Sequence, residues 1–524
     1  MKIRTFAAID VGSYEVAIKI FEFSVKNNMR EIDHIRLRLD LGSDTYSYGK
    51  ISNDKMDELC RTLAEFQEIM NAYKVEAYRA YATSAIRETA NTTIILAQIE
   101  QRTGIRLEVL SNSEQHFLDY KAAASRGNSF RKIMEEKTAI VDIGGGSIQF
   151  SLFDKDALVS TQNIRMGILR IQELLNHLNV RNSQLNIFIE EILAASLASY
   201  KKLYLKDKEI KNIIIIDDYI SPWALKRAGK NPEKAFIHME DFETILQMMQ
   251  KKSLVDIAQS MDITEEKAPL VCISTIVVHQ IARLMGAQMI WAPGVTLSDG
   301  IAYEYAEKKK LLTGEHNFER DIIACAANIS KRYMGSRKHT EFLEGISLSI
   351  FDSTKKLHGL GKRERLYLQI AALLYDCGKY ISLANVGETS YNIIMATEII
   401  GLSHLEREIV ANIVRFIYGE FNYYRQWQER GTTLDKSAYL LAAKLTAILQ
   451  LANSLNMSQK QKIKDVRIFL KDHELILSVE SAEDLTLDKG LFQTRTEFFQ
   501  EVFSVQPIIR MQKKLKGVGM KDGK

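Results

Sequence analysis

The stretches that decide the fold are Ile9-Asp10-Val11-Gly12-Ser13 and Val141-Asp142-Ile143-Gly144-Gly145-Gly146-Ser147. In each stretch an apolar strand reaches an aspartate, and a turn of glycine and serine follows. After both turns, over 15–20 and 147–152, polar and apolar residues alternate. A period of two indicates β-structure on both sides of the turn, whereas a P-loop or Rossmann glycine turn leads into a helix. The pattern therefore predicts two strand–turn–strand units.

Turns of this kind can bind anions, because glycine lets backbone N–H groups approach a ligand closely. Two such turns facing each other would clamp a phosphate chain. Asp10 and Asp142 would then hold a magnesium ion through its bound waters, since Mg²⁺ keeps several of them. The alternative is an ordinary pair of glycine-bearing hairpins, and the duplication favours the clamp. The candidate phosphate-binding residues in the turns are Gly12, Ser13, Gly144, Gly145, Gly146 and Ser147.

The whole chain has 524 residues, too many for one hydrophobic core, and three or four domains are expected. With 46% apolar and 26% charged residues it has the composition of a globular protein. A net charge of +4 is too small to argue for a nucleic-acid partner. No apolar run reaches the roughly 18 residues of a membrane span. The cysteines form no metal spacing or disulfide framework, which predicts a cytoplasmic protein; they are Cys60, Cys272, Cys325 and Cys377.

Hydrophobic periodicity predicts the order of the elements. A helix is expected over Asp54–Lys74, and strands over Thr138–Ile143 and Asn212–Ile216. From 311 to 460 only helical periodicity remains, and a hairpin around Lys471-Asp472-His473 follows. These shifts predict two α/β domains, an all-helical domain and a small α/β domain, with the bounds 1–128, 129–310, 311–460 and 461–524.

Further stretches make the chain resemble the exopolyphosphatase/guanosine pentaphosphate phosphohydrolase (Ppx/GppA) family. Beside the two glycine turns, they are Ala82-Thr83-Ser84-Ala85-Ile86-Arg87-Glu88, Val109-Leu110-Ser111-Asn112-Ser113-Glu114 and Leu297-Ser298-Asp299-Gly300. The resemblance implies two actin-like domains of the ASKHA, ribonuclease H-like type. They would be followed by an all-helical HD-related domain and a small α/β C-terminal domain.

The resemblance also implies a function. The chain would be a Mg²⁺-dependent hydrolase that releases orthophosphate from the end of inorganic polyphosphate or from the 5′ end of guanosine pentaphosphate (pppGpp). Glu114 aligns with the family's catalytic glutamate, the general base for the attacking water. Arg87, Thr83 and Ser84 would bind phosphate oxygens. A homodimer is expected, and no nucleic acid or membrane partner.

Two of these residues also have a simpler interpretation. Arg87 could pair with the neighbouring Glu88 or with another surface carboxylate. Ser111 and Glu114 fit S-x-x-E, the capping box that opens a helix, here one that continues to Ala124. A helix start can also aim a side chain at a cleft, so capping and catalysis are compatible for Glu114.

Several positions depart from the family pattern. The family continues its first motif as Ser-Asn-Ser-x-Arg, where this chain has Ser13-Tyr14-Glu15-Val16-Ala17. The second motif has Ile148-Gln149 in place of Thr-Glu. The acidic pair Asp217-Asp218 stands where a Gly/Ser/Thr loop is expected, and should repel a polyanion unless a cation bridges it. These losses motivate an alternative, a catalytically weakened binding or regulatory protein of the same fold. A third possibility, an actin-like kinase, needs a glycine-rich adenosine loop that Asp217-Asp218-Tyr219 does not supply.

The helical region lacks the ligands of a complete HD metal site. His339 matches the first histidine, but Tyr375 precedes Asp376 where the motif has His-Asp. Two candidate ligands cannot hold a hydrolytic metal tightly. We therefore expect this domain to be structural and His339 to be an ordinary packed or solvated histidine.

Overall fold

The structure is a computed structural model that describes residues 4–24, 28–155, 157–312, 314, 316–429, 434–455, 460, 462–481 and 483–511. It divides into two compact units. The first comprises residues 1–325 together with 398–403, and the second comprises 326–397 and 404–524. The basic tail that begins at Lys513 lies outside the described residues.

The first unit begins with a five-stranded sheet in the order β3-β2-β1-β4-β5. β1, β2 and β3 are antiparallel neighbours, whereas β4 and β5 run parallel to β1. The strands are β1 (Arg4–Val11), β2 (Glu15–Ser24), β3 (Asn28–Arg38), β4 (Ala77–Ala82) and β5 (Glu108–Val109). Its helices are α1 (Leu41–Tyr48), α2 (Asn53–Ala72), α3 (Ser84–Glu88) and α4 (Thr92–Thr103). The predicted helix over 54–74 is thus confirmed, with Leu59, Leu63 and Phe66 buried against the sheet.

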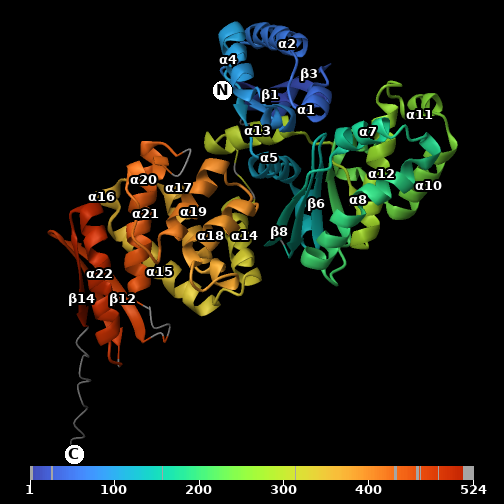
Figure 1. Cartoon of the computed structure of the whole chain (residues 1–524). Helices are drawn as coiled ribbons and strands as arrows, with labels where there is room; N and C mark the ends of the chain where they lie inside the picture. Colours follow the sequence, from blue (N-terminus) through green and yellow to red (C-terminus); the bar gives the residue numbers. More distant parts are fainter. Residues whose placement is uncertain are drawn as a thin grey trace, which may run out of the picture. The chain divides into compact units, whose positions relative to one another are not determined.

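A second sheet of the same unit has the order β10-β11-β9-β6-β7-β8. Its strands are β6 (Thr138–Ile143), β7 (Ile148–Asp154), β8 (Ala157–Ile164), β9 (Asn212–Ile216), β10 (Phe236–His238) and β11 (Met289–Trp291). In Figure 1, α7, α8, α10, α11 and α12 gather on one side of β6, and α5 lies on the other. The helices that follow β8 are α7 (Ile168–His177), α8 (Leu185–Tyr200), α9 (Ser221–Arg227), α10 (Met239–Lys251), α11 (Leu254–Met261) and α12 (Ala268–Met285).

The second sheet repeats the first. The order β8-β7-β6-β9-β11 matches β3-β2-β1-β4-β5, and the parallel and antiparallel pairs fall at the same places. In each copy the glycine turn joins the first two strands in the chain, β1 to β2 and β6 to β7. The duplicated strand–turn–strand motif thus begins two α/β sheets, as expected, and their division into two separate domains stays a prediction.

Helices α5 (Asn112–Ala124), α6 (Asn128–Met134) and α13 (Leu297–Lys308) complete the description of this unit. α5 packs on α13, and a side chain at Gly300 would meet the backbone oxygen of Leu118. Leu297 and Ile301 of α13 share a core with Phe6 and Ala8 of β1. The end of the second predicted domain therefore packs on the first sheet, and the boundaries at 128 and 310 stay predictions.

One helix among the described residues, α12, is long and apolar enough to cross a membrane. This corrects the expectation that no apolar run reaches that length. Most of this helix, 72% of it, is buried inside the protein. Val277, Ile281 and other side chains of α12 belong to the core beneath the second sheet, which accounts for the apolar composition.

The second unit is helical from α15 to α21, as the periodicity predicts. These helices are α15 (Arg337–Ser353), α16 (Lys355–His358), α17 (Lys362–Leu374), α18 (Val386–Ala396), α19 (His404–Arg415), α20 (Tyr424–Glu429) and α21 (Lys436–Ser454). The predicted hairpin forms between β12 (Ile463–Lys471) and β13 (Glu474–Ser481). After α22 (Thr486–Phe503), strand β14 (Gln506–Met511), which the sequence did not predict, pairs in parallel with β13. α14 (Phe318–Arg332) precedes this region.

Candidate active site

The two glycine turns have the same hydrogen-bonded form. The N–H of Gly12 donates to the carbonyl of Glu15 at 3.0 Å, and the N–H of Gly144 donates to that of Ser147 at 3.0 Å. The carbonyl oxygens within the turns are bonded by the segments that enter α1 and α7, Gly42 to Ser13 and Ile168 to Gly144. Because the N–H groups of Gly12 and Gly144 close their own turns, anion-binding donors have to come from the residues after them.

The turns meet across a cleft that opens to solvent. Gly12 and Ser13 line it from the first sheet, and Gly144 and Gly145 from the second. The Ser13 hydroxyl lies 2.8 Å from both the Ser84 and the Tyr46 hydroxyls. A cluster of hydroxyl groups therefore joins the first turn to the start of α3, beside the second turn.

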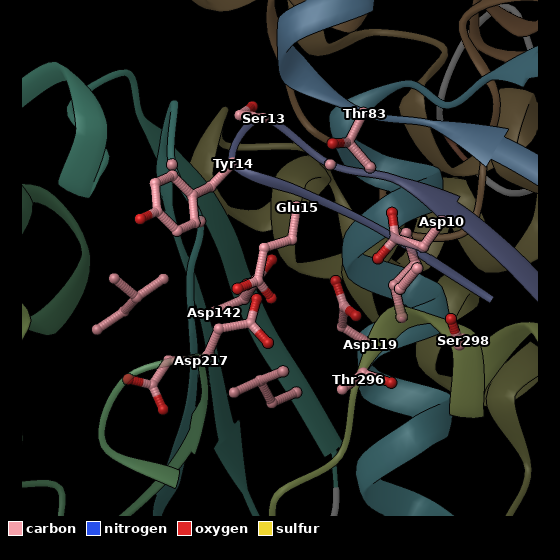
Figure 2. A pocket seen from close by; sticks show the side chains of 18 of the residues that line it. Asp10, Ser13, Tyr14, Glu15, Thr83, Asp119, Asp142, Asp217, Thr296 and Ser298 are labelled. Carbon is pink, nitrogen blue, oxygen red and sulfur yellow. The ribbon is translucent and has the colours of Figure 1, made fainter. Parts of the chain in front are cut away.

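Three carboxylates come together in the cleft, of which Asp119 and Asp142 are buried and Asp10 is half-buried. Figure 2 shows Asp10, Asp119 and Asp142 turned toward the same space. Burial, with the nearby carboxylates of Asp218 and Asp142, raises the pKa of Asp10 to about 7. Burial and the neighbouring Asp142 and Asp10 raise the pKa of Asp119 well above its ordinary value. So much negative charge out of water is stable only with protons or cations nearby.

These residues fit a magnesium ion held partly by water and substrate. Within the described ranges, no group of three or more His, Cys, Asp or Glu side chains is arranged to hold a metal by itself. Mg²⁺ is, however, commonly bound by one or two carboxylates, waters and substrate phosphates. The Oδ1 atom of Asp10 is buried and has no hydrogen-bond partner among the described residues. Asp10 and Asp142 are therefore suitable donors for such a site.

The cleft contains most of the predicted site residues. Those that line it are Asp10, Gly12, Ser13, Thr83, Ser84, Asp142, Gly144 and Gly145. The predicted residues that are not among its lining are Arg87, Glu114, Gly146 and Ser147. The motifs thus converge on one place, although not every side chain in them reaches it.

Glu114 acts as a helix cap in this structure. Its carboxylate accepts the Ser111 N–H at 2.9 Å, and the Ser111 hydroxyl accepts the Glu114 N–H at 3.3 Å, which completes the predicted capping box. The same helix instead presents Gln115 and Asp119 to the cleft. The catalytic role of Glu114 stays a prediction.

Arg87 donates from Nη1 to the carbonyl of Leu110 at 2.7 Å. Glu88 forms an ion pair with Arg170, and its negative charge also acts on the Arg87 guanidinium. Arg87 therefore braces the segment that leads into α5, and its role toward phosphate stays a prediction.

The acidic residues that depart from the family pattern have local partners. Asp217 accepts the N–H groups of Ile220 at 2.7 Å and Ser221 at 2.9 Å, so its charge stabilises the start of α9. Asp218 pairs with Arg36 at 3.3 Å, and Glu15 pairs with Lys267. The expected repulsion of a polyanion is therefore weaker than the bare sequence indicates.

Sequence reasoning missed five residues that line the cleft: Gln115, Asp119, His34, Arg36 and Lys267. Gln115 and Asp119 are four positions apart on α5, so helical spacing from the Ser111 cap could have placed them on one face. The other three could not be found this way, because their positions depend on strand pairing and on the approach of α12.

In the second unit, His339 is half-buried on α15. Asp376 is buried, and its Oδ2 lies 3.6 Å from Lys379 Nζ. The assignment of this region as HD-related stays a prediction.

Comparison with known proteins gives relatives over most of the chain. Exopolyphosphatase 1 of Mycobacterium leprae is 31% identical over 144 residues, which cover 27% of this chain and 41% of that protein, so the chain spans less than half of its length. The guanosine-5'-triphosphate,3'-diphosphate pyrophosphatase of Vibrio vulnificus is 22% identical over 501 residues, 91% of this chain and 92% of the relative. The crystal structure of an exopolyphosphatase from Cytophaga hutchinsonii aligns with a TM-score of 0.50 at 18% identity, covering 59% of this chain and 100% of that one.

The structural likeness shows that 59% of the chain shares the mixed α/β fold of that exopolyphosphatase. Residues 22–309 match the model of the Ppx/GppA phosphatase family, and residues 323–497 match that of Ppx/GppA phosphatase, domain III. Since the first match alone covers more than half of the chain, this protein belongs to the Ppx/GppA phosphatase family.

Proposed function

We propose that this protein hydrolyses a terminal phosphoanhydride bond and releases orthophosphate, either from inorganic polyphosphate or from the 5′ end of guanosine pentaphosphate. The observation that carries the proposal is the meeting of the two Gly/Ser turns at one cleft with Asp10 and Asp142. The relatives' names, an exopolyphosphatase and a guanosine-5'-triphosphate,3'-diphosphate pyrophosphatase, support hydrolysis ahead of binding without turnover.

The residues of the cleft would share the work as follows. Backbone N–H groups after Gly12 and Gly144 and the hydroxyls of Ser13 and Ser84 would orient the terminal phosphate. Asp10 and Asp142 would hold Mg²⁺, which when bound offsets charge on phosphate oxygens. No covalent intermediate is needed, because water can attack the phosphoryl group in line.

Glu114 remains our proposed base for that water. Its carboxylate would have to leave the Ser111 N–H, because a base must come within hydrogen-bond distance of the proton that it removes. Helix α5 would carry this rearrangement at its first turn, since residues 116–123 of the helix are buried.

Phosphate release from polyphosphate and from pppGpp tests the proposal, each with Mg²⁺ and with a chelator. We expect release that needs the metal, and a loss of at least about 100-fold in Asp142→Asn, which keeps the shape of the side chain. Arg337→Met, on an exposed helix end of the second unit, serves as the matched control. Tight binding of both substrates without any release would exclude the hydrolase and favour the regulatory alternative.

A further inference from the structure

Arg36 stands opposite the place where the family pattern has an arginine. Ala17 of β2 and Arg36 of β3 are direct partners in the antiparallel pair. Partners of this kind project from the same face of a sheet with Cβ atoms about 5 Å apart. Both residues line the cleft, and the small methyl group of Ala17 leaves room for the longer side chain beside it.

The present partners of Arg36 hold it loosely. Its Nη1 lies 3.5 Å from Glu15 Oε2 and 3.3 Å from Asp218 Oδ1. Charge-assisted N–H···O contacts are about 2.7–2.9 Å when they are strong. Asp218 is 60% exposed, so it can turn into solvent when another anion replaces it.

His34 orients the guanidinium. Arg36 Nε donates to His34 Nε2 at 2.9 Å. Burial and the positive charges of Lys19 and Arg36 lower the pKa of His34 to about 4. The imidazole is therefore neutral at neutral pH and accepts this hydrogen bond, which leaves the Nη end of Arg36 directed at anions.

The charge balance of the cleft makes Arg36 important for a polyanion. Among the described residues that line the cleft, Arg36 and Lys267 alone carry a permanent positive charge. Lys267 is already paired with Glu15. The planar fork of arginine also suits two phosphate oxygens better than a lysine does.

We propose that Arg36 binds the phosphate chain of the substrate from β3, in place of the arginine that the family pattern carries at position 17. Asp218 and Glu15 pair with Arg36 until the phosphates of the bound substrate replace them. The inference rests on the proposed function, and it names a residue that determines the affinity for phosphoanhydride chains.

Calorimetric binding of inorganic tripolyphosphate with Mg²⁺, together with phosphate-release kinetics, tests the assignment. Arg36→Ala should weaken binding at least tenfold, about 1.4 kcal/mol, and raise KM more than it lowers kcat. The double variant Ala17→Arg/Arg36→Ala moves the guanidinium to the partner strand and should recover most of the lost affinity. Arg38→Met, on the same face of β3 but outside the cleft, should change binding less than twofold.

Asp218→Ala separates phosphate binding from a purely structural role. If Arg36 only ties the two halves of the first unit together, removing Asp218 weakens binding as much as Arg36→Ala does, and the assignment is overturned. If Arg36 binds phosphate, loss of its competitor leaves the affinity unchanged or tighter.

The same measurements distinguish this inference from the proposed function. If the wild type releases phosphate and Arg36→Ala behaves identically, the role of Arg36 is overturned and the hydrolase stays in place. Tripolyphosphate binding that depends on Arg36, without release, would overturn the hydrolase and keep the role of Arg36. A wild type that neither binds nor releases phosphate would overturn both.

Discussion

Gly145 and Ser13 touch across the cleft: a Cβ atom on Gly145 would lie 3.1 Å from the Cβ of Ser13. It would also lie 2.8 Å from Cδ1 of Leu169. The close approach of the two turns thus depends on a missing side chain, and not on a special backbone angle, because Gly145 is not among the positive-φ glycines.

Gly145→Ala should therefore push the turns apart. We expect a loss of about 1–3 kcal/mol in the free energy of unfolding, the usual cost of overpacking. Urea unfolding measures it. The matched control is Gly144→Ala in the same turn, where the nearest atom to the new Cβ would be the Ser147 carbonyl oxygen at 3.5 Å, an ordinary contact. Equal stability of the two variants would contradict the close approach.

Asp217→Ala should destabilise the part of the cleft that lies between β9 and α9. The variant leaves the N–H groups of Ile220 and Ser221 and the Ser221 hydroxyl without their acceptor. We expect a loss of about 2–4 kcal/mol on thermal or urea unfolding. Asp218→Ala, the exposed neighbour, should cost no more than about 1 kcal/mol. A reversed order would show that Asp217 does not stabilise the start of α9.

Glu114→Gln separates catalysis from capping. Glutamine also closes a capping box, so the stability should change by less than about 0.5 kcal/mol. If Glu114 is the base, phosphate release should fall by about 100-fold or more, since about 100-fold is the lower end of the range for general bases. Ser111→Ala is the companion variant and should lose about 1 kcal/mol of stability through the cap. Turnover of Glu114→Gln equal to that of the wild type would restrict Glu114 to the cap.

His34 should make stability depend on pH. Its pKa of about 4 in the folded protein lies below the ordinary value of about 6.5. Between these values the unfolded chain binds more protons, so stability falls as the pH is lowered from about 6.5 to 4. His34→Gln should remove part of this fall, measured by urea unfolding at pH 7 and pH 5. His473→Gln, at the exposed β12–β13 turn, should keep the wild-type difference, and an unchanged difference in His34→Gln would contradict the prediction.

Several local features follow from sequence alone. The alternation around Gly12 and Gly144 predicts the two hairpins, and the apolar face of 54–74 predicts α2. The capping box of Ser111 and Glu114 is also correct. Such elements are set by residues within a few positions of one another, which is why they can be predicted without knowing the fold.

The contents of the cleft depended on contacts that are distant along the chain. Arg36 reaches it because β3 pairs with β2 in a register that sets Arg36 against Ala17. Lys267, the residue just before α12, reaches it although it lies 252 positions after its partner Glu15. The strand β14 was missed for the same reason, because α22 separates it along the chain from β13, the strand with which it pairs.

The sequence by itself determined two duplicated strand–turn–strand units, each with an aspartate beside its turn, because alternation and glycine act locally. Only the tertiary structure decided that the turns touch, that Asp217 accepts hydrogen bonds from the start of α9, and which cations face the carboxylates. Strand register and packing between the two halves set these contacts, and neither is written in any single stretch of residues.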